Sequence, residues 1–88
     1  MYTIATGRRK AAIARVYLKP GKGKIEVNGK DYKEYFPVKH LINKIEEAFK
    51  VTETDGKYDV KVNAVGGGIK GQAEALALGI SRALIEIN

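Results

Sequence analysis

The first third of the chain alternates apolar and polar residues in a pattern typical of half-buried β-strands. From Ala12 to Lys19, one set of alternate positions carries only alanine, valine and leucine, and the other set includes Arg15 and Tyr17. Because successive side chains of a strand point to opposite faces, we predict a strand with one face in the core. The other face would carry cations beside an aromatic ring.

Turn-forming residues separate this strand from two further β-prone segments, residues 2–6 and 25–27. Residues 19–24 contain a proline, two glycines and three lysines, which predicts an exposed turn rich in positive charge. Asn28-Gly29 is the dipeptide that most strongly favours a type I′ hairpin turn. Three strands are therefore expected before Pro37.

The period changes from two to between three and four after Pro37. Apolar residues recur at helical spacing from Val38 to Phe49 and again from about Gly71 to Ile87, which predicts two amphipathic helices. Thr54-Asp55-Gly56 predicts a turn, and residues 58–64 alternate as a fourth strand.

The expected order is β-β-β-α-β-α, an α+β chain folded as a two-layer α/β sandwich in which two helices cover one sheet face. We expect a single domain over residues 1–88. If the third and fourth strands are parallel, the general rule favours a right-handed crossover between them.

Charge is distributed unevenly along the chain, whose net charge is +6 and whose pI is about 9.6. Residues 1–45 carry eleven Lys and Arg against three acids, a net of +8, whereas residues 46–88 carry five against seven, a net of −2. Such asymmetry favours a polyanionic partner, and a merely solvated surface is the alternative. The lack of cysteine, of a leader segment and of a long apolar run predicts a cytoplasmic protein without a membrane partner.

A glycine-rich segment, Gly66 to Gly71, lies between the last predicted strand and the last helix and matches G-x-G-x-x-G. The chain is too short for the rest of a dinucleotide-binding fold, and no Walker A lysine follows. Backbone N–H groups at a helix start, with Lys70 nearby, favour an anionic oxygen of RNA or of a nucleotide. The alternative is that the glycines only allow a tight turn.

Enzymatic chemistry finds no support in the sequence. His40 is the single histidine and has no cysteine to share a metal with, and Ser81 has no base at helical spacing. We therefore expect no catalytic residue, no metal site and no cofactor. Arg82 and Glu86 are four residues apart, so Arg82 is equally well explained as a helix ion pair or as an RNA contact.

Four ordered motifs resemble those of the small-subunit ribosomal protein nine family, in its bacterial form, over nearly the whole chain. They are Thr6-Gly7-Arg8-Arg9-Lys10-Ala11-Ala12-Ile13-Ala14-Arg15-Val16, Ile25-Glu26-Val27-Asn28-Gly29-Lys30, Thr52-Glu53-Thr54-Asp55-Gly56-Lys57-Tyr58-Asp59-Val60, and Gly66-Gly67-Gly68 with Gly71-Gln72-Ala73.

The resemblance implies small-subunit ribosomal RNA and neighbouring small-subunit ribosomal proteins as partners. It also implies the fold of the second domain of ribosomal protein five, whose βαβ crossover is left-handed, and we follow it on this point. Family members continue as a basic tail that reaches tRNA. Nothing of the kind follows Asn88, so a tRNA contact is doubtful and a truncated or redesigned core is expected.

Three positions depart from the usual family pattern. Ala77 and Val38 stand where basic residues are common, which suggests that some RNA contacts are removed, and Ala48 stands where a proline is common. The RNA-binding candidates are Arg8, Arg9, Lys10, Arg15, Lys22, Lys24, Gly67, Gly68, Lys70, Gly71, Gln72 and Arg82. Two alternatives stay open, a small phosphate- or nucleotide-binding domain that uses the glycine-rich segment and a stable scaffold without a ligand.

Overall fold

Alternate residues of the long strands are buried, and this alternation gives the sheet one face in the core and one face toward solvent. A computed structural model describes residues 2–54 and 56–87 of the chain. The strands are β1 (Thr3–Arg9), β2 (Ala12–Pro20), β3 (Ile25–Val27), β4 (Lys30–Asp31) and β5 (Tyr58–Val65). The helices are α1 (Tyr32–Tyr35), α2 (Lys39–Val51) and α3 (Ile69–Ile87).

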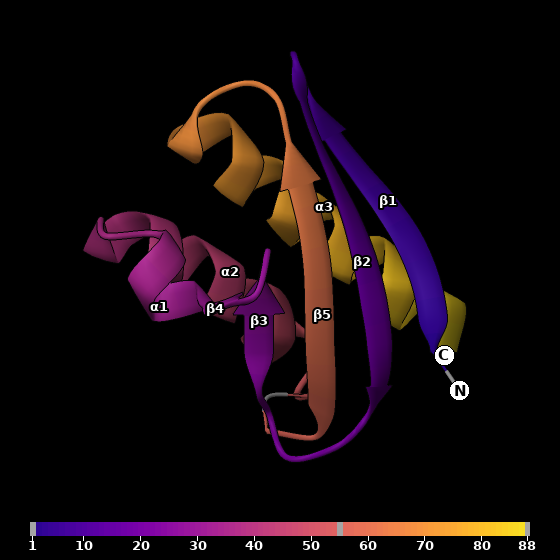
Figure 1. Cartoon of the computed structure of the whole chain (residues 1–88). Helices are drawn as coiled ribbons and strands as arrows, with labels where there is room; N and C mark the ends of the chain where they lie inside the picture. The colour runs from indigo at the N-terminus through magenta and orange to yellow at the C-terminus, as the bar shows by residue number, and fades with distance from the viewer. Residues whose placement is uncertain (1, 55, 88) are drawn as a thin grey trace.

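The strands form one sheet in the order β1-β2-β5-β3-β4, with α2 and α3 on the same side of it (Figure 1). The predicted two-layer α+β architecture is therefore confirmed. The two-residue strand β4 and the one-turn helix α1 were not predicted, because each is too short to show a period of its own.

The crossover between the two parallel strands is left-handed. β3 and β5 are paired in parallel, whereas β1 with β2, β2 with β5, and β3 with β4 are antiparallel. In Figure 1 the helices lie behind the sheet, β3 and β5 both point upward, and β5 lies to the right of β3. A connection that passes behind the sheet from β3 to β5 is therefore left-handed. The family resemblance implied this handedness, and the general rule favours the opposite one.

One apolar core joins the sheet to the helices. Its largest fully buried side chains include Leu18 of β2, Ile45 of α2 and Leu76 of α3, with Phe36 closing the end beside α1. Burying one such side chain contributes about 1.5–3 kcal/mol to stability relative to leaving it in water. The described part of the chain has no buried side-chain N or O atom without a hydrogen-bond partner.

Two glycines let α3 lie directly on β1. A Cβ atom on Gly7 would come within 1.8 Å of the Ala75 carbonyl oxygen, and a Cβ on Gly79 would come within 2.7 Å of Val16 Cγ2. Neither position tolerates a side chain without a shift of the backbone or of the core. This close packing places the start of α3 beside the turn between β1 and β2.

Most predicted boundaries agree with the structure to within two residues. Val38 is the N-cap of α2, and α3 begins at Ile69, which places Gly71 in its first turn instead of at its start. Asn28 and Gly29 have φ values of 50° and 85°, the positive values that a type I′ turn requires. The predicted turn at 54–56 includes Asp55, which lies outside the described residues. Among the helices described, none is both long and apolar enough to span a bilayer.

Candidate nucleic-acid interface

The glycine-rich segment lies against the tip of the β1–β2 hairpin. Gly66 and Gly67 have φ values of 74° and 59°, and a Cβ atom on Gly66 would come within 2.3 Å of the Ala11 carbonyl oxygen. A Cβ on Gly67 would meet the Ala12 methyl group at 2.9 Å. Close packing and positive φ therefore explain these two glycines without a ligand.

The same packing creates a shallow depression of about 390 Å³, which we call the hairpin–loop site. Three glycines and one alanine line it, together with three cations and one carboxylate. The first turn of α3, which starts at Ile69, adds N–H groups that are not paired within the helix. The lining residues are Arg9, Lys10, Ala11, Gly67, Gly68, Lys70, Gly71 and Glu74.

Glu74 balances part of this positive charge. Its carboxylate accepts a hydrogen bond from Arg9 Nε at 3.1 Å and forms an ion pair with Lys44 Nζ at 3.5 Å. The hydrogen bond from Arg9, followed by that from Lys44, lowers the pKa of Glu74 below its ordinary value. Exposed ion pairs of this kind contribute little to stability, so Arg9 is held in place loosely and can exchange its partner easily.

Gln72 connects the glycine-rich segment to the rest of the fold. Its side-chain Nε2 donates to the Gly66 carbonyl oxygen at 3.0 Å, and its Oε1 accepts from the Tyr35 hydroxyl at 2.5 Å. The Tyr35 hydroxyl in turn accepts from Asn28 Nδ2 at 3.2 Å. Gln72, which was predicted to bind RNA, therefore has an internal role in fixing the shape of the loop.

Arg8 and Arg15 lie on the opposite side of the sheet from Arg9. Strand β1 extends to Arg9, so adjacent residues Arg8 and Arg9 point to different faces, and the pairing of Arg8 with Ile13 and of Thr6 with Arg15 puts both arginines on the solvent face. The four basic RNA-binding candidates of this hairpin, Arg8, Arg9, Lys10 and Arg15, therefore do not form one surface. They share one end of the hairpin and occupy two faces of it.

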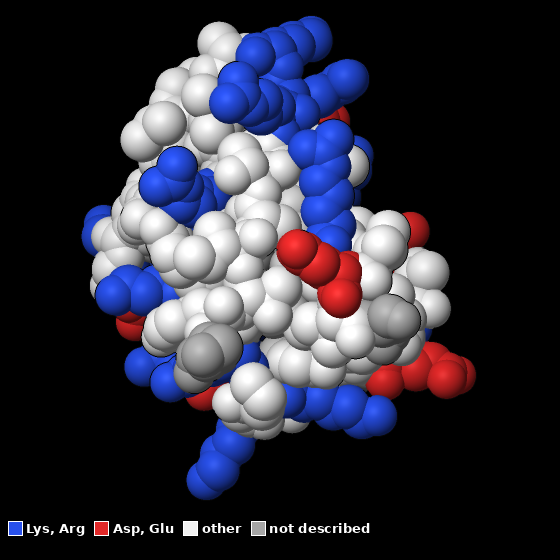
Figure 2. Space-filling view, turned by 90° about the vertical axis from the view of Figure 1, so that its right-hand side faces the viewer, with Lys and Arg blue, Asp and Glu red and all other residues white. Residues whose placement is uncertain are grey.

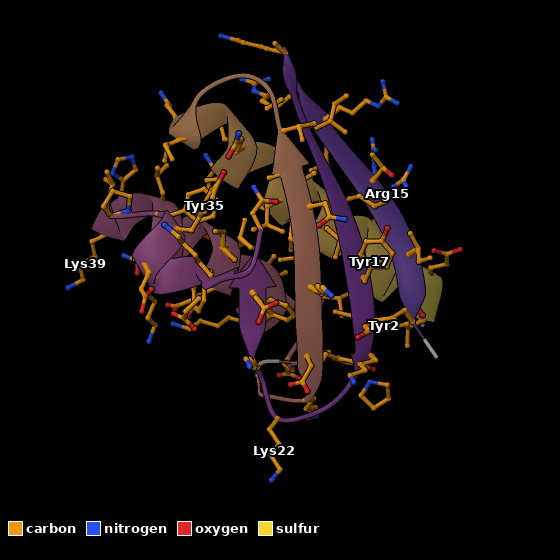
Figure 3. The ribbon with its side chains drawn as sticks, viewed as in Figure 1. Tyr2, Arg15, Tyr17, Lys22, Tyr35 and Lys39 are labelled. Carbon is orange, nitrogen blue, oxygen red and sulfur yellow. The ribbon has the colours of Figure 1, made fainter. Side chains whose placement is uncertain are left out.

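Lys22 and Lys24 lie at the other end of the sheet, in the turn between β2 and β3, as the label of Lys22 in Figure 3 shows. Their backbone N–H groups donate to Asp59 Oδ1 at 2.9 and 3.0 Å, and Gly23 N adds a third bond. These bonds, that of Lys24 first, lower the pKa of Asp59. The structure thus separates the two lysines from the hairpin–loop site by the length of β2.

Arg82 contacts the backbone of β1. Its Nη1 donates to the Thr6 carbonyl oxygen at 2.8 Å, and within the described residues it forms no ion pair with Glu86. The sequence suggested a helix ion pair or an RNA contact for Arg82, and neither of these describes the bond to Thr6. The bond joins residues 76 positions apart, so local spacing could not predict it.

Lys and Arg side chains gather over one end of the molecule. Figure 2 views the β1 side of the molecule, and blue atoms cover the upper end, where Figure 1 shows the hairpin tip and the glycine-rich segment. Further cations follow the left side of this view, which is the solvent face of the sheet seen from its margin. The upper end is therefore the most continuous positive surface in this view.

Other polar groups give no catalytic arrangement. Tyr32 donates to Glu46 Oε2 at 2.5 Å, and burial, followed by this bond, raises the pKa of the Tyr32 hydroxyl. A raised pKa keeps the phenol protonated and unreactive. His40 is exposed, and residues 2–54 and 56–87 contain no group of three His, Cys, Asp or Glu placed to hold a metal.

Sequence reasoning missed two residues that shape this region and a third on the solvent face of the sheet. Glu74 and Tyr35 act across the fold and carry no local signal. Tyr2 was assigned only to a strand, although the alternation of the hairpin places it near Lys19 on the solvent face. Extending the alternation of β2 across the turn would have found it.

Comparison with known proteins gives one consistent result. Residues 7–88 match a family model described as ribosomal protein S9/S16. Relatives named small ribosomal subunit protein uS9 include one from Maridesulfovibrio salexigens, 56% identical over 87 residues, which are 99% of this chain and 67% of the relative. One from Christiangramia forsetii is 51% identical over 93% of this chain and 64% of the relative, and one from Cytophaga hutchinsonii is 52% identical over 96% and 66%. The chain thus spans about two thirds of the length of these relatives.

Proposed function

Because the chain belongs to the ribosomal protein S9/S16 family, we propose that it is a structural, non-enzymatic constituent of the small ribosomal subunit that binds small-subunit ribosomal RNA. Its other partners are then neighbouring small-subunit ribosomal proteins, in the cytoplasm. The relatives carry the printed name of a small-subunit protein, and over the aligned residues this chain is 51% to 56% identical to the three of them.

The observation that carries the proposal is the hairpin–loop site. Arg9, Lys10 and Lys70 line a depression together with glycines of the glycine-rich segment, at the start of a 19-residue helix. Cations supply most of the affinity for a phosphate backbone, and N–H groups at a helix start favour anionic oxygens. Gly68 adds room, because no atom lies within 4 Å of where its Cβ would stand.

A salt titration with a fragment of small-subunit ribosomal RNA tests this proposal. The logarithm of the association constant should fall linearly with the logarithm of salt concentration, with a slope that reports about four to eight phosphates. The double variant Lys10→Ala and Lys70→Ala should weaken binding and reduce the slope by about two phosphate contacts.

Lys22→Ala with Lys24→Ala provides the matched control, since it removes the same charge from the opposite end of the sheet. We expect a smaller change in slope there, because Asp59 and Glu26 lie beside these lysines. Equal effects of the two double variants would contradict an interface centred on the hairpin–loop site. Saturable ATP binding without affinity for RNA would contradict the proposed function as a whole.

A further inference from the structure

The solvent face of the sheet presents side chains in regular rows across three strands. The pairing of the strands places Ile4, Tyr17 and Lys61 in one row and Thr6, Arg15 and Asn63 in the next. Neither α2 nor α3, nor any other described helix, lies on this side of the sheet (Figure 1). The face is therefore an open platform, and β2, the middle one of these three strands, carries an aromatic ring on it.

Two tyrosines lie side by side on this platform. The ring centroids of Tyr2 and Tyr17 are 5.9 Å apart with an angle of 83° between the ring planes, and Lys19 Nζ lies 5.4 Å from the centre of the Tyr2 ring. Figure 3 shows both rings in front of the hairpin, with Arg15 farther along β2. Because the rings meet edge to face and Tyr2 is 42% exposed, ring surface stays available to a further planar group.

Charge on the same face favours an anionic ligand. The rows carry the cations Arg8, Arg15, Lys19 and Lys61 against the carboxylates of Glu26 and Asp59. Asp59 accepts three backbone N–H bonds that hold its carboxylate at the turn between β2 and β3, and the four cations outnumber the two carboxylates on this face. A shallow hollow of about 320 Å³ beside Tyr2 and Lys19 also reaches Lys61.

We infer that this face binds single-stranded RNA, with one base stacked on the Tyr2–Tyr17 pair and the flanking phosphates on Arg15, Lys19 and Lys61. The inference deepens the proposed function, since it rests on RNA as the partner and adds a second contact, distinct from the hairpin–loop site. Bases inside an RNA duplex are covered by their neighbours, so only an unpaired nucleotide offers its ring to a side chain. Exposed aromatic residues on an open antiparallel sheet are a recurring solution for such nucleotides.

Fluorescence of 2-aminopurine tests the stacked base directly. The wild-type chain is titrated into a single-stranded RNA of about eight nucleotides with 2-aminopurine at its centre. We expect quenching on binding, because the base stacks on tyrosine. Tyr17→Leu should weaken binding at least about fivefold, whereas Tyr17→Phe, which keeps the ring, should bind within about twofold of wild type.

An abasic nucleotide at the central position supplies the matched control ligand. The wild type should bind the abasic RNA about as weakly as Tyr17→Leu binds the intact RNA, and Tyr17→Leu should not discriminate between the two. The salt slope should be the same for wild type and Tyr17→Leu, because the substitution removes no charge.

Unchanged 2-aminopurine fluorescence in the bound complex, or intact RNA affinity in Tyr17→Leu, would overturn the inference and leave the face to a protein partner. The ribosomal RNA titration described above separates this failure from failure of the proposed function. If the folded fragment binds with steep salt dependence while the oligonucleotide shows no quenching, only the stacking site is refuted.

Discussion

Asn28 is expected to be the most stability-sensitive polar residue of the chain. Strand β3 ends at Val27, and the side-chain amide of Asn28 continues the pairing of β3 with β5. Asn28 Nδ2 donates to the Ala64 carbonyl oxygen, and Asn28 Oδ1 accepts from Ala64 N, both at 2.9 Å. A third bond, from Nδ2 to the Tyr35 hydroxyl, measures 3.2 Å. The side chain thus replaces one residue of backbone in the sheet.

The cost of Asn28→Ala follows from these contacts. Three hydrogen bonds at about 1 kcal/mol each give a loss of about 3 kcal/mol. Asn28 also has a φ of 50°, and alanine in this left-handed conformation costs about 1 kcal/mol more. The expected loss of about 4 kcal/mol is a large part of the roughly 4–13 kcal/mol that stabilises a domain of this size. Asn28→Gly loses the same bonds without the strain, so it should be about 1 kcal/mol more stable than Asn28→Ala.

Urea unfolding followed by far-UV circular dichroism measures these differences. Asn43→Ala is the matched control, because Asn43 is exposed on α2 and its truncation should change stability by no more than about 0.5 kcal/mol. Equal stability of Asn28→Ala and wild type would refute the strand-continuation argument. A glycine variant less stable than the alanine variant would refute the assignment of strain at this position.

Two further predictions concern packing and acid stability. Gly7→Ala should lower the melting temperature by at least about 8 °C, because its methyl group would overlap the Ala75 carbonyl oxygen. Gly68→Ala is the control and should have little effect on the melting temperature. Similar shifts in both variants would contradict the close packing of α3 on β1. The backbone bond from Lys24 and its neighbours lowers the folded-state pKa of Asp59, so its stabilisation is present above about pH 4 and is lost as the pH falls through that lowered pKa. Asp59→Asn should therefore flatten the decline of melting temperature below about pH 4, and parallel declines in variant and wild type would exclude this role.

Local patterns were sufficient to predict most of the fold. The alternation from Ala12 to Lys19 correctly gave the buried and solvent faces of β2, and Asn28-Gly29 correctly gave the turn after β3. The left-handed crossover came from the family resemblance alone, since no residue of the chain encodes it locally. The short elements β4 and α1 were missed because two and four residues cannot establish a period.

The candidate site was less predictable because it depends on contacts across the chain. The first strand was predicted to end at Thr6, so alternation was not applied to Arg8 and Arg9, which point to opposite faces. Gln72 was assigned to RNA from its place in a motif, whereas its bonds to Tyr35 and Gly66 span 37 and 6 positions. Only the folded chain shows that these side chains are already engaged.

The contact between Arg82 and Thr6 has a consequence for how the molecule behaves at high concentration. β1 is an outermost strand, and such strands offer unpaired backbone groups that recruit strands of other molecules. The guanidinium group occupies the Thr6 carbonyl oxygen, so a foreign strand could pair there only by displacing a charged donor. Arg82 of α3 thereby protects the edge of the sheet at β1 and disfavours the assembly of this basic chain into intermolecular β-structure.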